Sequence, residues 1–152
     1  MAFPIFTTHT DGTSEVIAAA HMNSVQTAAT TLNVYDLSLS AEAVMANSEV
    51  MIRWVAPRAL TIPANLAGSS GSATVSPTGS TALTIRRRAS GSQTYTTVGT
   101  ITFPTGTWPV AATLSTQVAT NFVTGDELSV LGPATADATL ASWSFTLVLV
   151  NT

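Results

Sequence analysis

The sequence predicts an all-β protein, an antiparallel β-sandwich of jelly-roll-like form preceded by a short N-terminal arm with one helix. Short runs of alternating apolar and polar residues begin at Leu32, and Gly- or Pro-containing turns separate them. The 152 residues include 27 threonines and 16 serines, and β-branched threonine suits a pleated surface. We expect residues 1–30 to form the arm and residues 31–152 to form the sandwich.

The N-terminal arm is predicted to contain a single helix. An Asp11-Gly12 turn is followed by a capping hydroxyl at Thr13 or Ser14. Apolar and small residues then recur at spacings of three and four, which predicts a weakly amphipathic helix over about 14–29. Its narrow, Ala-rich stripe needs a surface to pack against, either on its own domain or on a neighbouring subunit.

The strands of the sandwich are predicted from runs with a period of two, because successive strand residues point to opposite faces. Val50, Ile52 and Trp54 are expected on the core side of one run, and Trp143 is expected in the core from another. The clearest runs cover residues 33–39, 49–55, 100–103, 127–130 and 142–149. The turns between strands are expected at residues 67–72, 77–79, 90–92, 104–106, 124–126 and 132–133.

The charge balance excludes several classes of function. Only 9% of the residues are charged, against about 25% in an ordinary soluble domain. The net charge of −3 gives no attraction to nucleic acid, and the absence of cysteine excludes disulfides and thiolate metal sites. No apolar run approaches the roughly 20 residues that span a bilayer. We expect no nucleic-acid binding, no membrane insertion and no export signal.

The scarcity of charge indicates a subunit of an assembly. A free monomer usually keeps more charge for solubility, whereas this chain has no lysine and covers its surface with hydroxyl groups. A threonine hydroxyl bonds to water or to a partner's backbone, and it avoids the cost of burying a lysine in an interface. A lightly charged free surface is the alternative interpretation.

The run Arg86-Arg87-Arg88 is the candidate contact with acidic groups of a neighbouring subunit or a capsid protein. On a strand, Arg86 and Arg88 share one face, and Arg87 shares the other with Leu83 and Ile85. A solvated strand end is the alternative interpretation of this run.

Trp108, which lies between two turn-forming segments, is the candidate ligand-facing aromatic residue, because sugar rings stack on exposed aromatic rings. The alternative role of Trp108 is to cover one end of the sandwich. No catalytic, cofactor or metal site is predicted, since His9 and His21 are the only histidines and no nucleophile motif is present.

The acidic residues of the last third are predicted to be structural. Asp126 and Glu127 are neighbours on a strand and point to opposite faces, which argues against a glycosidase pair. Asp126 follows a glycine in a turn, where its side chain is expected to cap backbone amides, and Asp137 is expected to hold its loop.

Five short segments follow one another in an order that is similar to a known module. They are ALTIPANLAGS at 59–69, TIR at 84–86, VGTITF at 98–103, GDELSV at 125–130 and PATADATLA at 133–141. Residues from about 55 to 150 thereby resemble a β-sandwich module of tailed-bacteriophage virion structural proteins. The segment AAHMN at 19–23, after the Asp11-Gly12 turn, is similar to the opening of short phage virion proteins. A polar, Lys-bearing hairpin of that module is replaced here by the three arginines and a longer loop.

The resemblance implies a β-sandwich and a role in the virion, and it transfers no catalytic residues. We therefore expect an oligomeric capsid decoration or cement protein, or a short fibre, that attaches to the particle surface and stabilises it. The expected partners are other copies of the chain, arranged as a homotrimer, and the phage major capsid protein or tail proteins. The alternative is a receptor- or glycan-binding tail-fibre or tail-tip module that contacts a host surface glycan. An enzyme has the least support.

Overall fold

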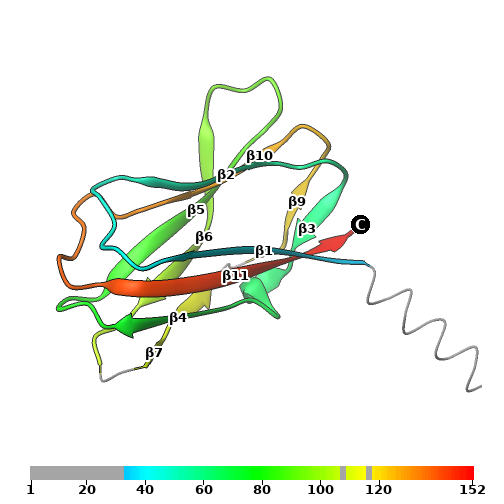
Figure 1. Ribbon diagram of the computed structural model, residues 1–152. Helices are drawn as coiled ribbons and strands as arrows, with labels where there is room; N and C mark the ends of the chain where they lie inside the picture. The colour runs from blue at the N-terminus through cyan, green and yellow to red at the C-terminus, as the bar shows by residue number, and fades with distance from the viewer. Residues whose placement is uncertain (1–32, 107–108, 116–117) are drawn as a thin grey trace, which may run out of the picture. The chain divides into compact units, whose positions relative to one another are not determined.

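A computed structural model describes residues 33–106, 109–115 and 118–152 of the chain. Val34–Thr152 form one compact unit made of two antiparallel sheets (Figure 1). The predicted all-β class is confirmed, and two antiparallel sheets around a shared core are consistent with a β-sandwich. The helix predicted over about 14–29 lies outside the described residues. No helix in the described part of the chain is long and apolar enough to cross a membrane.

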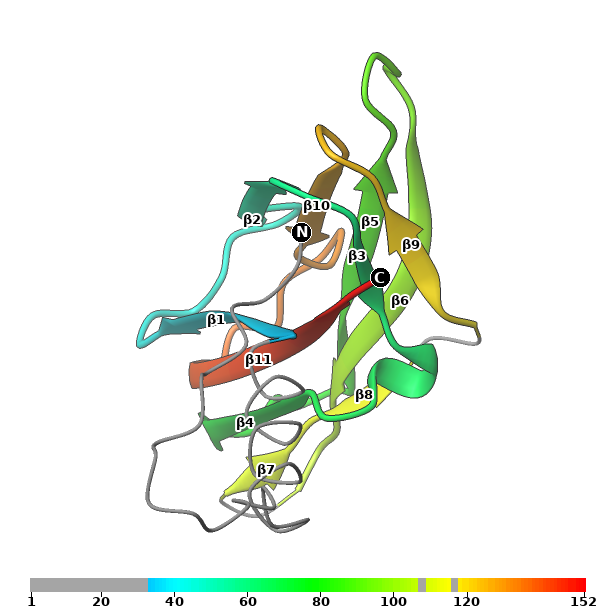
Figure 2. The same ribbon diagram turned by 90° about the vertical axis from the view of Figure 1, so that its right-hand side faces the viewer.

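One sheet is built around the longest strand of the chain. Its strands are β1 (Val34–Ala41), β3 (Leu60–Ile62), β4 (Ser70–Val75), β7 (Val110–Ala111), β9 (Thr120–Phe122) and β11 (Ala141–Asn151). β11 pairs with β1 along one side and with β4 and β3 along the other (Figure 2). β7 extends this sheet beyond β4, and β9 extends it beyond β3.

The other sheet has five strands in the order β2-β10-β5-β6-β8. Their bounds are β2 (Val50–Val55), β5 (Thr81–Arg88), β6 (Tyr95–Phe103), β8 (Thr113–Ser115) and β10 (Glu127–Leu131). A short 3₁₀ helix, η1 (Ala64–Leu66), follows β3. β5 and β6 form a hairpin whose loop projects at the top of Figure 1.

The core lies between the sheets and follows the predicted alternation most clearly on β11. Trp143, Phe145, Leu147 and Leu149 are buried, and the residues between them are partly exposed. The rings of Trp143 and Phe145 stack with their centroids 6.0 Å apart. Apolar burial of this kind provides most of the stabilising free energy in a chain that has no disulfides.

The alternation predicted for β2 is only partly correct. Ile52 is buried, and Trp54 lies on the same face, half-buried against the core with its ring centroid 5.5 Å from that of Tyr35, as predicted. Val50 departs from the prediction, since it is 44% exposed. The physical reason is a β-bulge: Val130 pairs with Ile52, and the next residue of β10 pairs with Val50, so that Met51 is an extra residue. An extra residue reverses the faces of the side chains on either side of it.

The turn predicted at residues 67–72 extends too far along the chain. Gly68 has a φ of +84°, as a turn requires, but β4 already begins at Ser70. Gly71 lies within this strand, and a Cβ there would come within 3.1 Å of Ala112 and 3.2 Å of Phe145. Glycine permits this close approach, so the small residues that suggested a turn serve packing instead.

We expect Leu147→Ala to lower the free energy of unfolding by about 2–5 kcal/mol, because the substitution leaves a cavity at a fully buried position. The matched control is Val148→Ala on the opposite face of β11, where the side chain is half-buried. The measurement is equilibrium unfolding in urea. Equal losses in the two variants would contradict the placement of Leu147 at the centre of the core.

Candidate functional site

The three consecutive arginines lie at the end of β5, and the predicted division of their faces is confirmed. Arg87 pairs opposite the buried Leu128, and its guanidinium lies 5.8 Å from the ring centroid of Phe122. Arg86 and Arg88 lie on the other face of the sheet, over the ring of Tyr95. The hairpin pairing of Arg88 with Tyr95 produces this arrangement.

Asp126 is the partner of Arg87 and is completely buried. Arg87 donates to Asp126 Oδ2 through Nε at 2.9 Å and through Nη2 at 2.6 Å. The backbone amides of Ser90 and Val123 also donate to this carboxylate, at 2.9 and 3.1 Å, which confirms that it caps backbone amides. Burial alone would raise the pKa of Asp126, but the two amides and Arg87 outweigh it and hold the pKa below its ordinary value.

Glu127 lies on the opposite face and is 5% exposed, although it belongs to an outer sheet surface. The side chains of Arg88 and Arg53 cover it, with Arg88 Nη2 at 2.6 Å from Oε2 and Arg53 Nε at 3.1 Å from Oε1. The Tyr95 hydroxyl donates to Oε1 as well. The Tyr95 hydrogen bond and the charge of Arg88 lower the pKa of Glu127 against the opposing effect of burial.

A basic patch remains on this outer face after the ion pairs have formed. Arg86 donates to the Ser129 hydroxyl at 3.1 Å and pairs with no carboxylate in the described part of the chain. Arg53 and Arg88 share the single carboxylate of Glu127. With Arg86, three guanidinium groups lie on this face beside one carboxylate, so two positive charges are left over. We define the basic patch as Arg53, Arg86, Arg88 and Tyr95.

Tyr95 and Arg53 belong to this site although the sequence pattern does not predict them there. The predicted turn at residues 90–92 could have placed Tyr95 opposite Arg88, because a hairpin pairs the residues on its two sides. Arg53 comes from β2, and only the pairing of β2 with β10 places it near Glu127. The contact between the three arginines and a neighbouring subunit remains a prediction, since the observed ion pairs are within one chain.

The outer surface of the six-stranded sheet carries a second feature, which we call the hydroxyl face. Three adjacent strands, β1, β11 and β4, align their hydroxyl side chains in two rows across the sheet. The serines on β1 and β4 are exposed, and those on β11 are half-buried. The first row is Ser38, Thr146 and Ser70, and the second is Ser40, Ser144 and Ser72. Asp36 is the charged residue on the same face of β1.

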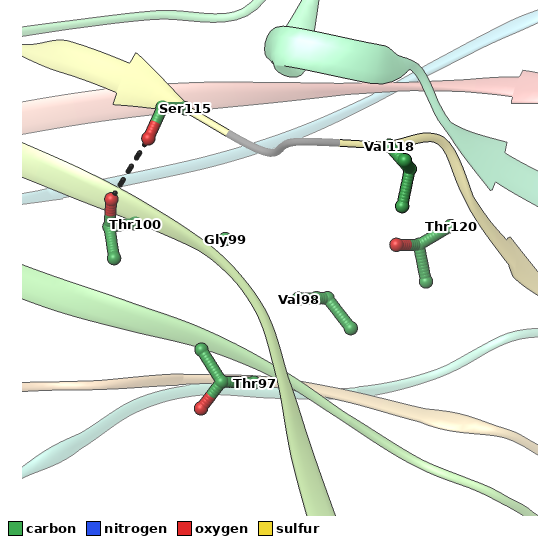
Figure 3. Close-up of a pocket in the computed structure, with 7 residues that line it drawn as sticks. All are labelled: Thr97, Val98, Gly99, Thr100, Ser115, Val118 and Thr120. Carbon is green, nitrogen blue, oxygen red and sulfur yellow. Dashed lines mark hydrogen bonds between the residues drawn. The ribbon is translucent and has the colours of Figure 1, made fainter.

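A hollow of about 520 Å³ opens beside β6 where β8 ends (Figure 3). It is lined by Thr97, Val98, Gly99, Thr100, Ser115, Val118 and Thr120. The hydroxyls of Thr100 and Ser115 lie 3.3 Å apart at one side of it. These residues include four hydroxyl groups and two valines but no charge, which suits a neutral polar ligand better than an ion.

Asp137 holds its loop, as predicted. Its Oδ1 accepts hydrogen bonds from the amide and hydroxyl of Thr139 and from the amide of Leu140. Its Oδ2 accepts from the amide and hydroxyl of Thr78 and from the amide of Gly79. The hydroxyls of Thr139 and Thr78, with the amides, hold the pKa of Asp137 well below its usual range. The carboxylate thus joins two loops that are far apart in the sequence.

Three of the residues considered from the sequence, His9, His21 and Trp108, lie outside the described residues. Within residues 33–106, 109–115 and 118–152, no three His, Asp or Glu side chains are grouped so that they could hold a metal ion. Comparison of the chain with protein-family models, with curated proteins and with solved structures finds no match.

We expect Arg87→Ala to lower the free energy of unfolding by about 2–3 kcal/mol, because it leaves the buried carboxylate of Asp126 without its cation. About a third of the Arg87 side chain reaches solvent, which keeps the loss below that of a fully buried pair. The control is Arg58→Ala in the exposed loop after β2, which should change stability little. Equal urea midpoints for the two variants would show that the Arg87–Asp126 pair contributes nothing.

Acid is expected to destabilise the protein through Asp126 and Glu127. Both have a folded-state pKa below the ordinary value, so their contribution is complete above the unfolded-state pKa and is lost as the pH falls through the folded-state pKa. Urea unfolding at pH 7, 5 and 3 should show a falling free energy of unfolding. Asp126→Asn should weaken this pH dependence; an unchanged dependence would remove Asp126 as a cause.

Proposed function

We propose that this chain is a bacteriophage virion structural protein that self-associates and attaches to the particle surface. Its role is that of a capsid decoration or cement protein, or of a short fibre, and it acts by contact rather than by chemistry. The proposed fold is a jelly-roll-like β-sandwich that follows an N-terminal arm. The location is the virion, and the partners are the major capsid protein or tail proteins.

The observation that carries the proposal is the hydroxyl face. Two rows of Ser and Thr hydroxyls cover three adjacent strands, with Asp36 as the neighbouring charge. A partner that covers such a face removes water from hydroxyl groups rather than from ammonium or guanidinium groups, which costs less free energy. Each hydroxyl can exchange its water for a partner group, at a net gain of about 1 kcal/mol when the hydrogen bond is well formed.

The basic patch supports the same proposal with a different kind of contact. Its two surplus positive charges suit acidic side chains on a capsid or tail protein, and the planar guanidinium groups can bind carboxylates through two hydrogen bonds. Arg53 is the most accessible part of the patch, since 62% of its side chain is exposed. A cement protein with two such surfaces bridges neighbouring capsid subunits, so that opening the shell must break additional contacts.

The hollow beside β6 favours the alternative function, a receptor- or glycan-binding tail-fibre or tail-tip module. Its hydroxyls can hydrogen-bond to sugar hydroxyls, and Val98 and Val118 offer apolar surface to a sugar ring. The described lining residues include no aromatic ring, and aromatic stacking is a main source of affinity for sugars. We therefore rank this function second.

The test of the virion role is the composition of purified particles. Mass spectrometry and immunogold labelling are expected to find the chain at a fixed copy number on the phage that encodes it. Particles that lack its gene should bind the recombinant full chain and then resist heating longer. Particles without the chain, or no binding to deficient particles, would contradict the proposal.

Lysines on the hydroxyl face should weaken attachment. Ser70→Lys together with Ser72→Lys is expected to lower the affinity for deficient particles at least tenfold, because two ammonium groups must be desolvated. The control is Thr113→Lys, an exposed position on β8 of the other sheet.

If the recombinant chain instead binds a glycan array, and Trp108→Ala abolishes that binding, the alternative function is favoured.

A further inference from the structure

The strands at the sheet edges differ sharply in how they are protected from pairing with a further strand. β7, β8 and β9 are two or three residues long, too short to accept a partner strand. β2 has six residues but is interrupted by the bulge at Met51 and carries the exposed Arg53. β1 has eight residues and pairs with β11 over its whole length with no register shift.

Within residues 33–106, 109–115 and 118–152, β1 shows none of the features that keep natural edge strands from pairing. Such strands are usually short, bulged, or protected by lysine or proline, and β1 contains no lysine, no proline and no bulge. Its one charged residue is Asp36. Tyr35, Leu37 and Leu39 face the core but are only half-buried. A strand added beside β1 would satisfy its outer backbone groups and bury more of these side chains.

We propose that β1 pairs with β1 of a second copy. The two strands are antiparallel, and the two-fold axis passes between the Ser38 residues of the two copies, which we call the axis at Ser38. The inference rests on the proposed function in that it names the self-association surface. The contact joins the six-stranded sheets of the two copies into one continuous sheet. It extends the hydroxyl face across the dimer, with Ser70, Thr146 and Ser38 of each copy in one row.

The partner strand beside β1 is expected to come from a second copy because β1 is complementary to itself. Residues opposite each other in an antiparallel pair point to the same face. One residue of β1 must therefore lie opposite its equivalent in the second copy, so that the apolar sides of both strands face the core. With the axis at Ser38, Leu37 lies opposite Leu39 of the second copy. Asp36 lies opposite Ser40, whose hydroxyl can donate to the carboxylate.

Charge selects this register over its neighbours. With the axis at Ser38, the two Asp36 positions are roughly 13 Å apart along the strands, but with the axis at Leu37 they are only about 7 Å apart. An axis at Leu39 would place Asp36 opposite Glu42 of the second copy, which is destabilising. The contact is isologous and closes after two copies, whereas the trimer expected from the sequence needs two different surfaces.

Sedimentation velocity of the full chain over a range of concentrations tests this contact. The wild type should form a dimer. Ser38→Lys and Ser38→Asp should each weaken the dimer at least tenfold, because each places two like charges opposite each other at the axis. Ser40→Lys should strengthen it severalfold, since the ammonium lies opposite Asp36 of the second copy. The control, Thr113→Lys, adds the same charge at an exposed position on β8 of the other sheet and should leave the dimer unchanged.

The substitutions at Ser38 and the substitution at Ser40 are expected to change the dimer affinity in opposite directions. This distinguishes a lost contact from a damaged fold, because a damaged fold cannot strengthen a dimer. A wild type that stays monomeric, a trimer unaffected by these substitutions, or a dimer strengthened by Ser38→Lys would each overturn the inference. Particle binding distinguishes its failure from that of the proposed function. If deficient particles bind the chain while the Ser38 variants self-associate as the wild type does, only the β1 contact is wrong.

Discussion

The pairing of β11 is the interaction on which the described structure depends. This strand of eleven residues pairs with β1 on one side and with β4 and β3 on the other, and it places Phe145 and Leu147 in the core. The chain has no cysteine, so no covalent bond can replace these contacts. The same pairing aligns the hydroxyl rows and leaves β1 at the edge of the sheet among the described strands. The pairing of β11 therefore determines both the packing of the core and the arrangement of the hydroxyl groups on the outer surface.

The few charges of the chain are used mainly within the fold. Asp126 and Glu127 are buried against Arg87 and Arg88, where they join the end of β5 to the start of β10. A buried ion pair stabilises little compared with apolar residues of the same size, but it penalises alternative pairings that leave a charge alone. The outer sheet surfaces carry the hydroxyl face and the small basic patch. Such surfaces suit binding to other proteins, which is the basis of the proposed function.

Predictions from the sequence succeeded where a local pattern decides the structure. The division of faces between Arg87 and its neighbours follows from the period of two, and the roles of Asp126 and Asp137 follow from turn chemistry. They failed where distant contacts intervene. The bulge at Met51 exposes Val50, and Gly71 lies in a strand rather than a turn because it pairs with Phe145, a residue far away in the sequence.

Alternation of apolar and polar residues, an abundance of threonine and a shortage of charge are local properties, and from them the sequence by itself determined an all-β chain with hydroxyl-covered surfaces. Tertiary structure alone decided which strands became neighbours. Arg53 reaches Glu127, and Ser38 aligns with Thr146 and Ser70, through pairings between segments far apart in the chain. The physical reason is that any strand of suitable pattern can pair with several others. Only simultaneous packing of both sheets on one core selects the partners, the registers and the open edge.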